Sequence, residues 1–240
     1  GGRIMNSLIY QGLFFLFILL LLAVPLGWYI KEIMQGEIPK GVSFLQPVER
    51  LFYKAIGPIS KKEMSAKRYA LNVLLLSFFS IVLLIAILMT KHFLPGGSSV
   101  KNLTLPLAIN TAVSYVTNTN WQAYVGETTL SNTSQMFGLT AQNFVSAGVG
   151  LSVLVALLRG LSQVKKKALG NFWQDLTRSL VYILLPISII LAVLLISQGT
   201  VQSFQSGVAY QGLEGKSLWL HLGPVASQVA IKQLGTNGGG

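Results

Sequence analysis

Four long segments of the chain contain no charged residue, and they limit the fold to that of a membrane protein. They are residues 4–30, 70–90, 136–158 and 179–197, and a helix needs ~20 residues to cross the bilayer hydrocarbon. The whole chain is 52% hydrophobic and 10% charged, with a mean hydropathy of +0.60, which is typical of polytopic membrane proteins. We therefore predict an all-α polytopic membrane protein with about four transmembrane helices.

The first segment has an alternative interpretation as a cleaved signal peptide. Its apolar run is much longer than the ~7–15 residues of a signal-peptide core, and VPLG at residues 24–27 makes a poor cleavage site. A transmembrane helix is therefore the favoured interpretation. Residues 1–4 precede Met5, the expected start, and we interpret them as a remnant of a fusion sequence.

The basic residues gather in two loops. Of the 18 Lys and Arg residues, eight lie in residues 31–68 and five in residues 159–178, on alternate connections between the predicted helices. Because cytoplasmic loops carry such an excess, we expect both loops to be cytoplasmic and residues 91–135 and 199–240 to face outward. Topology and contact with membrane lipid explain the net charge of +11, so no nucleic-acid partner is expected. The chain has no cysteine, which excludes disulfides and thiol chemistry.

Two short apolar segments on the outer side are each followed by a polar run. Residues 105–116 would form only ~18 Å of helix, too short to span, and residues 117–122 follow them; we name these the first polar run. Residues 223–234 precede a second polar run, residues 235–239. A short helix followed by polar chain predicts a re-entrant pore loop. The Thr-Asn pair recurs after 117 residues, from Thr119-Asn120 to Thr236-Asn237, which indicates an internal repeat.

The composition of the polar runs favours a monovalent cation as the ligand. Irregular backbone at membrane depth survives only where protein or water surrounds it, and neither run contains a carboxylate, the usual ligand of Mg²⁺ or Ca²⁺. Backbone carbonyls and Thr and Asn side-chain oxygens can replace the hydration shell of such an ion. Each short helix would direct its partly negative C-terminal end at the run that follows. Taken alone, the first run is more typical of an ordinary outer loop, and the second could be a flexible loop or linker; their joint occurrence after matched short helices favours the pore interpretation.

The sequence around these runs resembles a known family, the potassium-binding A subunit of the bacterial Kdp-type potassium-importing P-type ATPase. The resemblance rests on NTAVSYVTNTNWQAYVGETTLSNTSQMFGLTAQNF at residues 110–144, ALGNFWQDL at 168–176, and GPVASQ with AIKQLGTNGGG within 223–240. Members of this family are similar to potassium channels, with four repeats of helix, pore loop and helix around one selectivity filter. The resemblance extends from Met5 onward and covers less than half of such a subunit.

The resemblance implies a function for the chain and a role for each polar run. The chain would be the potassium-selective binding and translocation subunit of an ATP-driven uptake complex in the bacterial cytoplasmic (inner) membrane. Its partners would be the P-type ATPase catalytic subunit and small accessory membrane subunits, and potassium its only ligand, with no ATP site in this chain. The implied filter residues are Thr117, Asn118, Thr119, Asn120, Gln122, Gly235, Thr236, Asn237, Gly238 and Gly239.

The expected organisation follows from the same resemblance. Residues 5–69 would hold an extra transmembrane helix and a basic loop, residues 70–160 the first pore repeat, and residues 161–240 a second repeat that stops in its filter, so the chain would be an N-terminal portion of the subunit. One alternative is a non-conducting structural or assembly fragment. A membrane-embedded enzyme is disfavoured, because no nucleophile with a base and no paired carboxylates are found in the polar runs.

Overall fold

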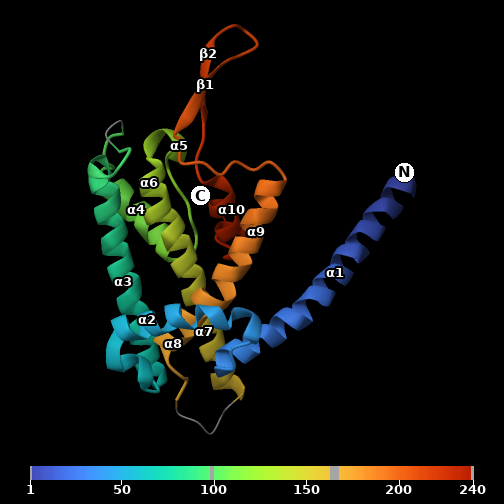
Figure 1. Ribbon diagram of the computed structural model, residues 1–240, viewed down its shortest axis with the longest axis vertical. Helices are drawn as coiled ribbons and strands as arrows, with labels where there is room; N and C mark the ends of the chain where they lie inside the picture. The colour runs from blue at the N-terminus through green and yellow to red at the C-terminus, as the bar shows by residue number, and fades with distance from the viewer. Residues whose placement is uncertain (1, 98–99, 163–167, 239–240) are drawn as a thin grey trace. The chain divides into compact units, whose positions relative to one another are not determined.

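The computed structural model describes residues 2–97, 100–162 and 168–238 (Figure 1). The chain divides into two compact units, one up to Pro47 and one from Val48 onward. The first unit consists mainly of one apolar helix, α1 (Gly2–Gln35), which contains Pro25. This helix ends in a Schellman motif, in which Gly36 adopts a φ of 91° and its amide donates to the Ile33 carbonyl at 3.0 Å. A 3₁₀ turn (Lys40–Leu45) leads to the amphipathic helix α2 (Gln46–Ile56).

Four helices among the described residues are long and apolar enough to cross a membrane: Ser7–Gln35, Ala66–Phe93, Asn132–Ser162 and Phe172–Ser197. They confirm the predicted all-α polytopic membrane fold. The second contains α3 (Ala66–Thr90); the third joins α6 (Asn132–Ser134), a π-helical turn (Gln135–Thr140) and α7 (Ala141–Ser162). The fourth joins α8 (Phe172–Arg178), a π-helical turn (Ser179–Leu184) and α9 (Leu185–Ser197).

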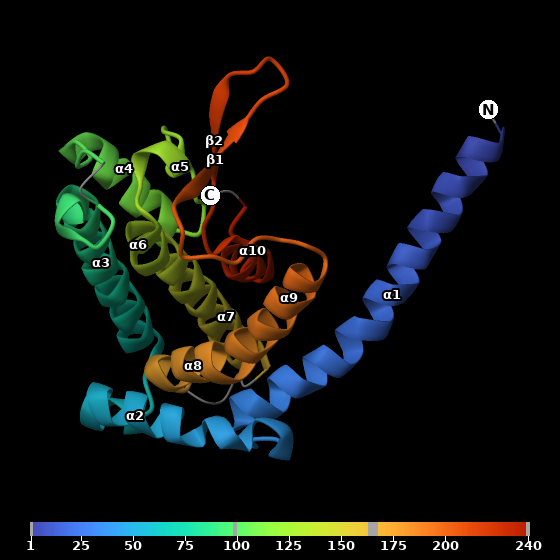
Figure 2. The same ribbon diagram turned by 45° about the horizontal axis from the view of Figure 1, so that its top comes forward.

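The two short apolar segments both form helices that pack inside the second unit. The first, α4 (Leu105–Val116), packs against α3 and α7, and the second, α10 (Val225–Leu234), packs against α9 and α7 (Figure 2). In α4 the buried residues recur at helical spacing, namely Ala108, Thr111, Ala112 and Tyr115, whereas Ile109 and Val113 are exposed. Helix α7 thus contacts both short helices, which places the end of each one near it.

A small residue allows α7 to approach the fourth spanning helix closely. A Cβ on Gly148 would lie 2.6 Å from Cδ2 of Leu180, a distance that side chains do not tolerate without movement. Within SAGVG at residues 146–150, Gly148 therefore forms a packing contact, as small residues commonly do between membrane helices, whereas Gly150 is exposed with no atom within 4 Å of an added Cβ. Leu180 itself belongs to the π-helical turn before α9.

A β-hairpin between α9 and α10 was not predicted from the sequence. Strand β1 (Gly207–Gln211) pairs with β2 (Ser217–His221) in antiparallel register, with Gly207 opposite His221, and the hairpin projects beyond α10 in both ribbon views (Figures 1 and 2). Every residue of β2 is exposed, so the usual alternation of apolar and polar residues gives no signal here. The short helix α5 (Gly126–Thr129) lies at the same end of the second unit (Figure 1).

Candidate functional site

The first polar run leaves the C-terminus of α4 in a tight turn organised by Ser114. The Ser114 carbonyl accepts hydrogen bonds from the amides of Thr119 at 2.9 Å and Asn120 at 3.2 Å, and its hydroxyl accepts one from the amide of Trp121 at 2.6 Å. Two non-glycine residues in this turn adopt a left-handed backbone conformation, Asn118 with a φ of 63° and Asn120 with a φ of 61°. Asn tolerates this region better than most residues, which explains their position in the turn.

The second polar run leaves α10 in a related turn. The amide of Asn237 donates to the Lys232 carbonyl at 3.1 Å, and the left-handed residues are Thr236, with a φ of 53°, and Gly238, with a φ of 84°. Only glycine fits at position 235, because a Cβ there would lie 2.3 Å from Oδ1 of Asn237. The last residue of this run, Gly239, lies outside the described residues.

The two polar runs lie side by side, although 117 residues separate them in the sequence. The Asn118 amide donates from Nδ2 to the Gly235 carbonyl at 3.3 Å, and Asn118 Oδ1 accepts a hydrogen bond from Nδ2 of Asn237. A Cβ on Gly238 would lie 3.7 Å from the Thr119 carbonyl oxygen. The structure therefore brings residues 117–120 together with residues 235–238.

The Thr and Asn side chains of the runs have opposite environments. Asn120 and Asn237 are each 1% exposed, whereas Thr117, Thr119 and Thr236 are exposed. Thr119 also lines a hollow of about 440 Å³ together with Ser114 and Trp121. Each run thus has a hydroxyl-bearing side that is open and an amide-bearing side that is held by protein. In the described part of the chain, no cluster of three or more His, Cys, Asp or Glu residues could hold a metal ion.

Gln122, unlike Asn118 and Asn120, has its side chain near the loop that follows the first run. Its Nε2 donates to the Tyr124 hydroxyl oxygen at 3.3 Å, and the side chain lies near Gly126 of α5. Burial raises the pKa of Tyr124 above its usual value, which favours the neutral phenol. No hydrogen bond links Gln122 to the described part of the second run, residues 235–238.

Two buried residues of α7 contact both runs, and sequence analysis missed them. Asn143 is fully buried, and its Oδ1 accepts a hydrogen bond from Nδ2 of Asn120 at 2.6 Å. Ser146, one turn further, donates from Oγ to Oδ1 of Asn118 at 2.8 Å and accepts from Nδ2 of Asn237 at 3.2 Å. Asn143 and Ser146 are two of five polar residues in the mainly apolar segment 136–158, where buried polar groups require partners.

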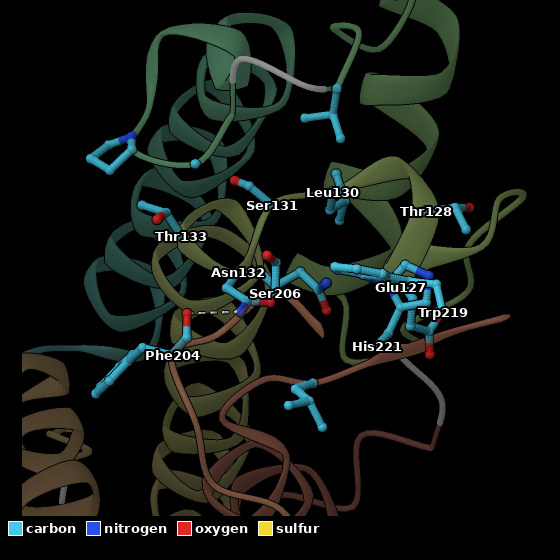
Figure 3. Close-up of a pocket in the computed structure, with 15 residues that line it drawn as sticks. Glu127, Thr128, Leu130, Ser131, Asn132, Thr133, Phe204, Ser206, Trp219 and His221 are labelled. Atoms are coloured by element: carbon cyan, nitrogen blue, oxygen red, sulfur yellow. Dashed lines mark hydrogen bonds between the residues drawn. The ribbon is translucent and has the colours of Figure 1, made fainter. Parts of the chain in front are cut away.

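A separate cavity of about 600 Å³ lies between the hairpin and the loop after the first run (Figure 3). Glu127, Trp219 and His221 lie near one another along one side of it, and Asn132 lies near Phe204 on another. Nδ2 of Asn132 donates to the Phe204 carbonyl at 3.5 Å. Residues 117–122 and 235–238 do not line this cavity, so it is distinct from the polar runs.

Comparison with known proteins identifies relatives over almost the whole chain. The family model described as "Potassium-transporting ATPase A subunit" matches residues 13–240. The chain is 53% identical over 238 residues to a Listeria monocytogenes protein named "Potassium-transporting ATPase potassium-binding subunit". It is 48% identical over 246 aligned positions to a Clostridium botulinum protein and 46% identical to a Clostridium perfringens protein of the same name. Each match covers 98% of this chain and 42% of the relative's length.

Proposed function

The chain belongs to the potassium-transporting ATPase A subunit family, and from this premise we propose that its two polar runs form part of a potassium-selective filter. The single observation that carries the proposal is the side-by-side arrangement of the runs, which have exposed Thr residues and buried Asn residues and lack carboxylates. Neutral oxygens favour a weakly hydrated monovalent cation over Mg²⁺ or Ca²⁺. Backbone carbonyls and Thr hydroxyls would replace the water around potassium, while the Asn side chains hold the runs from behind.

The electrostatics of the two short helices support the same ligand. Helix α4 ends at Val116 and α10 at Leu234, each directly before a polar run. A helix C-terminus carries a partial negative charge, so both helices favour a cation at the level of the runs. The only acidic residue shortly after the first run is the exposed Glu127.

The direction of transport and the partners are part of the proposal. The excess of basic residues in residues 31–68 and 159–178 favours a cytoplasmic location for those loops in the bacterial inner membrane, so the polar runs would receive potassium from outside. The relatives are named as subunits of an ATPase, and we assign ATP hydrolysis to a P-type catalytic subunit, with small accessory membrane subunits completing the complex. The chain spans about two fifths of the length of those relatives, and the remainder would supply the other filter runs.

Rubidium and potassium uptake in potassium-transport-deficient bacteria tests the proposal, with this segment in a full-length subunit and all partner subunits present. We expect Gly238→Ala to weaken discrimination between potassium and sodium, because Gly238 has a φ of 84° and its Cβ would face the Thr119 carbonyl at 3.7 Å. The matched control is Gly199→Ala, where φ is 88° and a Cβ would meet no atom within 4 Å. Equal selectivity in both variants and the parent would overturn the proposal.

A further inference from the structure

We propose that Asn143 and Ser146 of α7 are positioning residues of the ion site, which clamp the two polar runs to each other and to one rigid helix. This inference rests on the proposed function, because it assigns a role in ion selection to residues that would not touch the ion. We name the set Asn118, Asn120, Asn143, Ser146 and Asn237 the amide clamp. Each member has a partner on a different segment of the chain.

The clamp acts first on the backbone of the first run. Asn118 and Asn120 hold left-handed conformations, which Asn adopts more readily than most L residues but which still cost free energy relative to the right-handed region. Their side-chain amides help to hold these conformations, since Asn120 donates to Asn143 Oδ1 at 2.6 Å and Asn118 accepts from Ser146 Oγ at 2.8 Å. The position of each strained peptide unit in the run is thereby tied to α7.

The clamp acts secondly across the two runs. Asn237 donates from Nδ2 to Ser146 Oγ at 3.2 Å, to the Asn143 carbonyl at 3.2 Å, and also to Asn118 Oδ1. Ser146 Oγ therefore contacts one Asn from each run. Because Asn237 lies more than 90 positions from each of these three partners, local secondary structure cannot fix the spacing of the two runs, and the clamp does so instead.

Because the clamp is buried, its hydrogen bonds favour one position of the two runs relative to α7. Asn143 is 0% exposed and Ser146 is 4% exposed, so no solvent is available to replace a lost partner. Asn120 Oδ1, Asn143 Nδ2 and Asn237 Oδ1 are already buried without a hydrogen bond, and a shifted run would add further unsatisfied amide groups. Helix α7 is itself fixed at Gly148, two residues from Ser146, by close contact with Leu180. The clamp thus attaches both runs to α7, a helix that is packed closely against its neighbour.

Selection between potassium and sodium depends on how firmly the oxygens that surround the ion keep their spacing and number. The clamp lies behind those oxygens, opposite the exposed Thr side of the runs. Its loss should therefore reduce discrimination between ions more than it reduces the maximal rate of uptake. A residue with a purely structural role would instead lower the amount of folded protein and leave the ratio of ions unchanged.

The test measures potassium, rubidium and sodium uptake by the complete complex carrying Asn143→Ala or Ser146→Ala in a full-length subunit. We expect each substitution to lower the potassium-over-sodium ratio of uptake efficiency about tenfold, equivalent to ~1.4 kcal/mol, with the maximal rubidium rate changed less than about threefold. If the complex with Asn143→Ala fails to assemble, Ser146→Ala provides the test, because this substitution removes only one hydroxyl group.

Two controls separate the clamp from general stability. Ser152→Ala removes a buried hydroxyl from the same helix, whose Oγ bonds only within α7, to the Gly148 carbonyl at 2.7 Å. Asn72→Ala removes a buried amide that bonds Nε1 of Trp173 at 2.9 Å, in another part of the unit. Both are expected to keep the parent's ion ratio, even where the thermal stability of the complex falls.

The outcomes distinguish this inference from the proposed function. If Gly238→Ala reduces discrimination while Asn143→Ala and Ser146→Ala retain the parent's ratio, or lose no more than the two controls, the clamp is wrong and the filter stands. If Gly238→Ala also leaves discrimination unchanged, the proposed function itself fails. A fall in the ratio for Gly238→Ala and for both clamp variants, but for neither control, at a normal maximal rubidium rate, supports the clamp.

Discussion

Removing the carboxylate of Asp175 should destabilise the second unit strongly, because this group is buried in an ion pair. Asp175 is 1% exposed and receives two hydrogen bonds from the Arg159 guanidinium, Nη1 to Oδ2 at 2.6 Å and Nη2 to Oδ1 at 2.9 Å. The Tyr69 hydroxyl donates a further bond to Oδ2 at 3.1 Å. The pair and Tyr69 therefore join α3, α7 and α8.

The expected cost of Asp175→Asn is about 3 kcal/mol, the lower end of the ~3–5 kcal/mol found when one partner of a buried pair is removed. The lower end applies because the Arg159 side chain retains 23% exposure, so solvent partly compensates the unpaired guanidinium. For a unit of this size that free energy corresponds to a fall in Tm of about 6–12 °C. The double variant Arg159→Met with Asp175→Leu should lose much less, since it leaves no buried charge unpaired.

Thermal unfolding in detergent micelles, followed by tryptophan fluorescence, measures these changes. The control is Glu214→Gln, which breaks an exposed pair with Lys216 at 2.9 Å, where both side chains are more than three quarters exposed; its Tm should stay at the parent value. A fall of less than about 2 °C for Asp175→Asn, or a double variant that loses the sum of both single losses, would refute the account of a buried and mutually dependent pair.

We expect two further results, one from the packing of α7 and one from the proposed ion site. Gly148→Ala should destabilise by about 1–3 kcal/mol through overpacking, because its Cβ would lie 2.6 Å from Leu180, whereas Gly150→Ala, with no atom within 4 Å of the added carbon, should not; equal Tm values for both would contradict the close contact. The 240-residue chain alone should show the same Tm in potassium chloride and sodium chloride at equal ionic strength, because the family resemblance implies that two polar runs supply half of a filter. Potassium-specific stabilisation of this chain would contradict that expectation.

The membrane helices and short helices could be predicted because their signals are local. Apolar runs of sufficient length specify spanning helices, and α4 begins and ends at the residues expected, Leu105 and Val116. The fourth spanning helix begins at Phe172 instead of residue 179, because its polar first turns are helical and bury Asp175. Charge alone marked those turns as loop, whereas tertiary pairing with Arg159 makes them part of the helix.

The interior position of Lys91 could not be predicted for the same reason. The sequence placed it among the solvated residues of the outer loop, yet its side chain is 0% exposed and its Nζ donates to the Thr129 carbonyl. The partner lies 38 residues away, in α5, and nothing in the local sequence indicates that contact. A lysine at the end of an apolar segment ordinarily extends its charge into water.

The polar runs could be located from sequence, but their arrangement depends on contacts between distant segments. Thr-Asn pairs after short apolar segments are visible in the sequence, and their shared lack of carboxylates predicts a monovalent cation as the ligand. The opposite exposure of Thr119 and Asn120 was not visible, because it results from the hydrogen bond between Asn120 and Asn143. The contacts of α7 with both runs join segments that are distant in the sequence, so local sequence patterns do not predict them.

The sidedness of the runs explains why Thr and Asn alternate in them. The exposed Thr hydroxyls keep their oxygen lone pairs for a cation even where they donate a proton to the backbone, as Thr117 Oγ1 does to the Val113 carbonyl at 2.8 Å. An Asn next to each Thr provides the anchor with a different group, as Asn237 does through Nδ2 toward Ser146, and leaves the Thr236 side exposed. Exchanging the order of Thr236 and Asn237 in the full-length subunit should therefore abolish selective uptake with the composition unchanged. Normal selectivity after that exchange would mean that residue content, and not sidedness, determines the site.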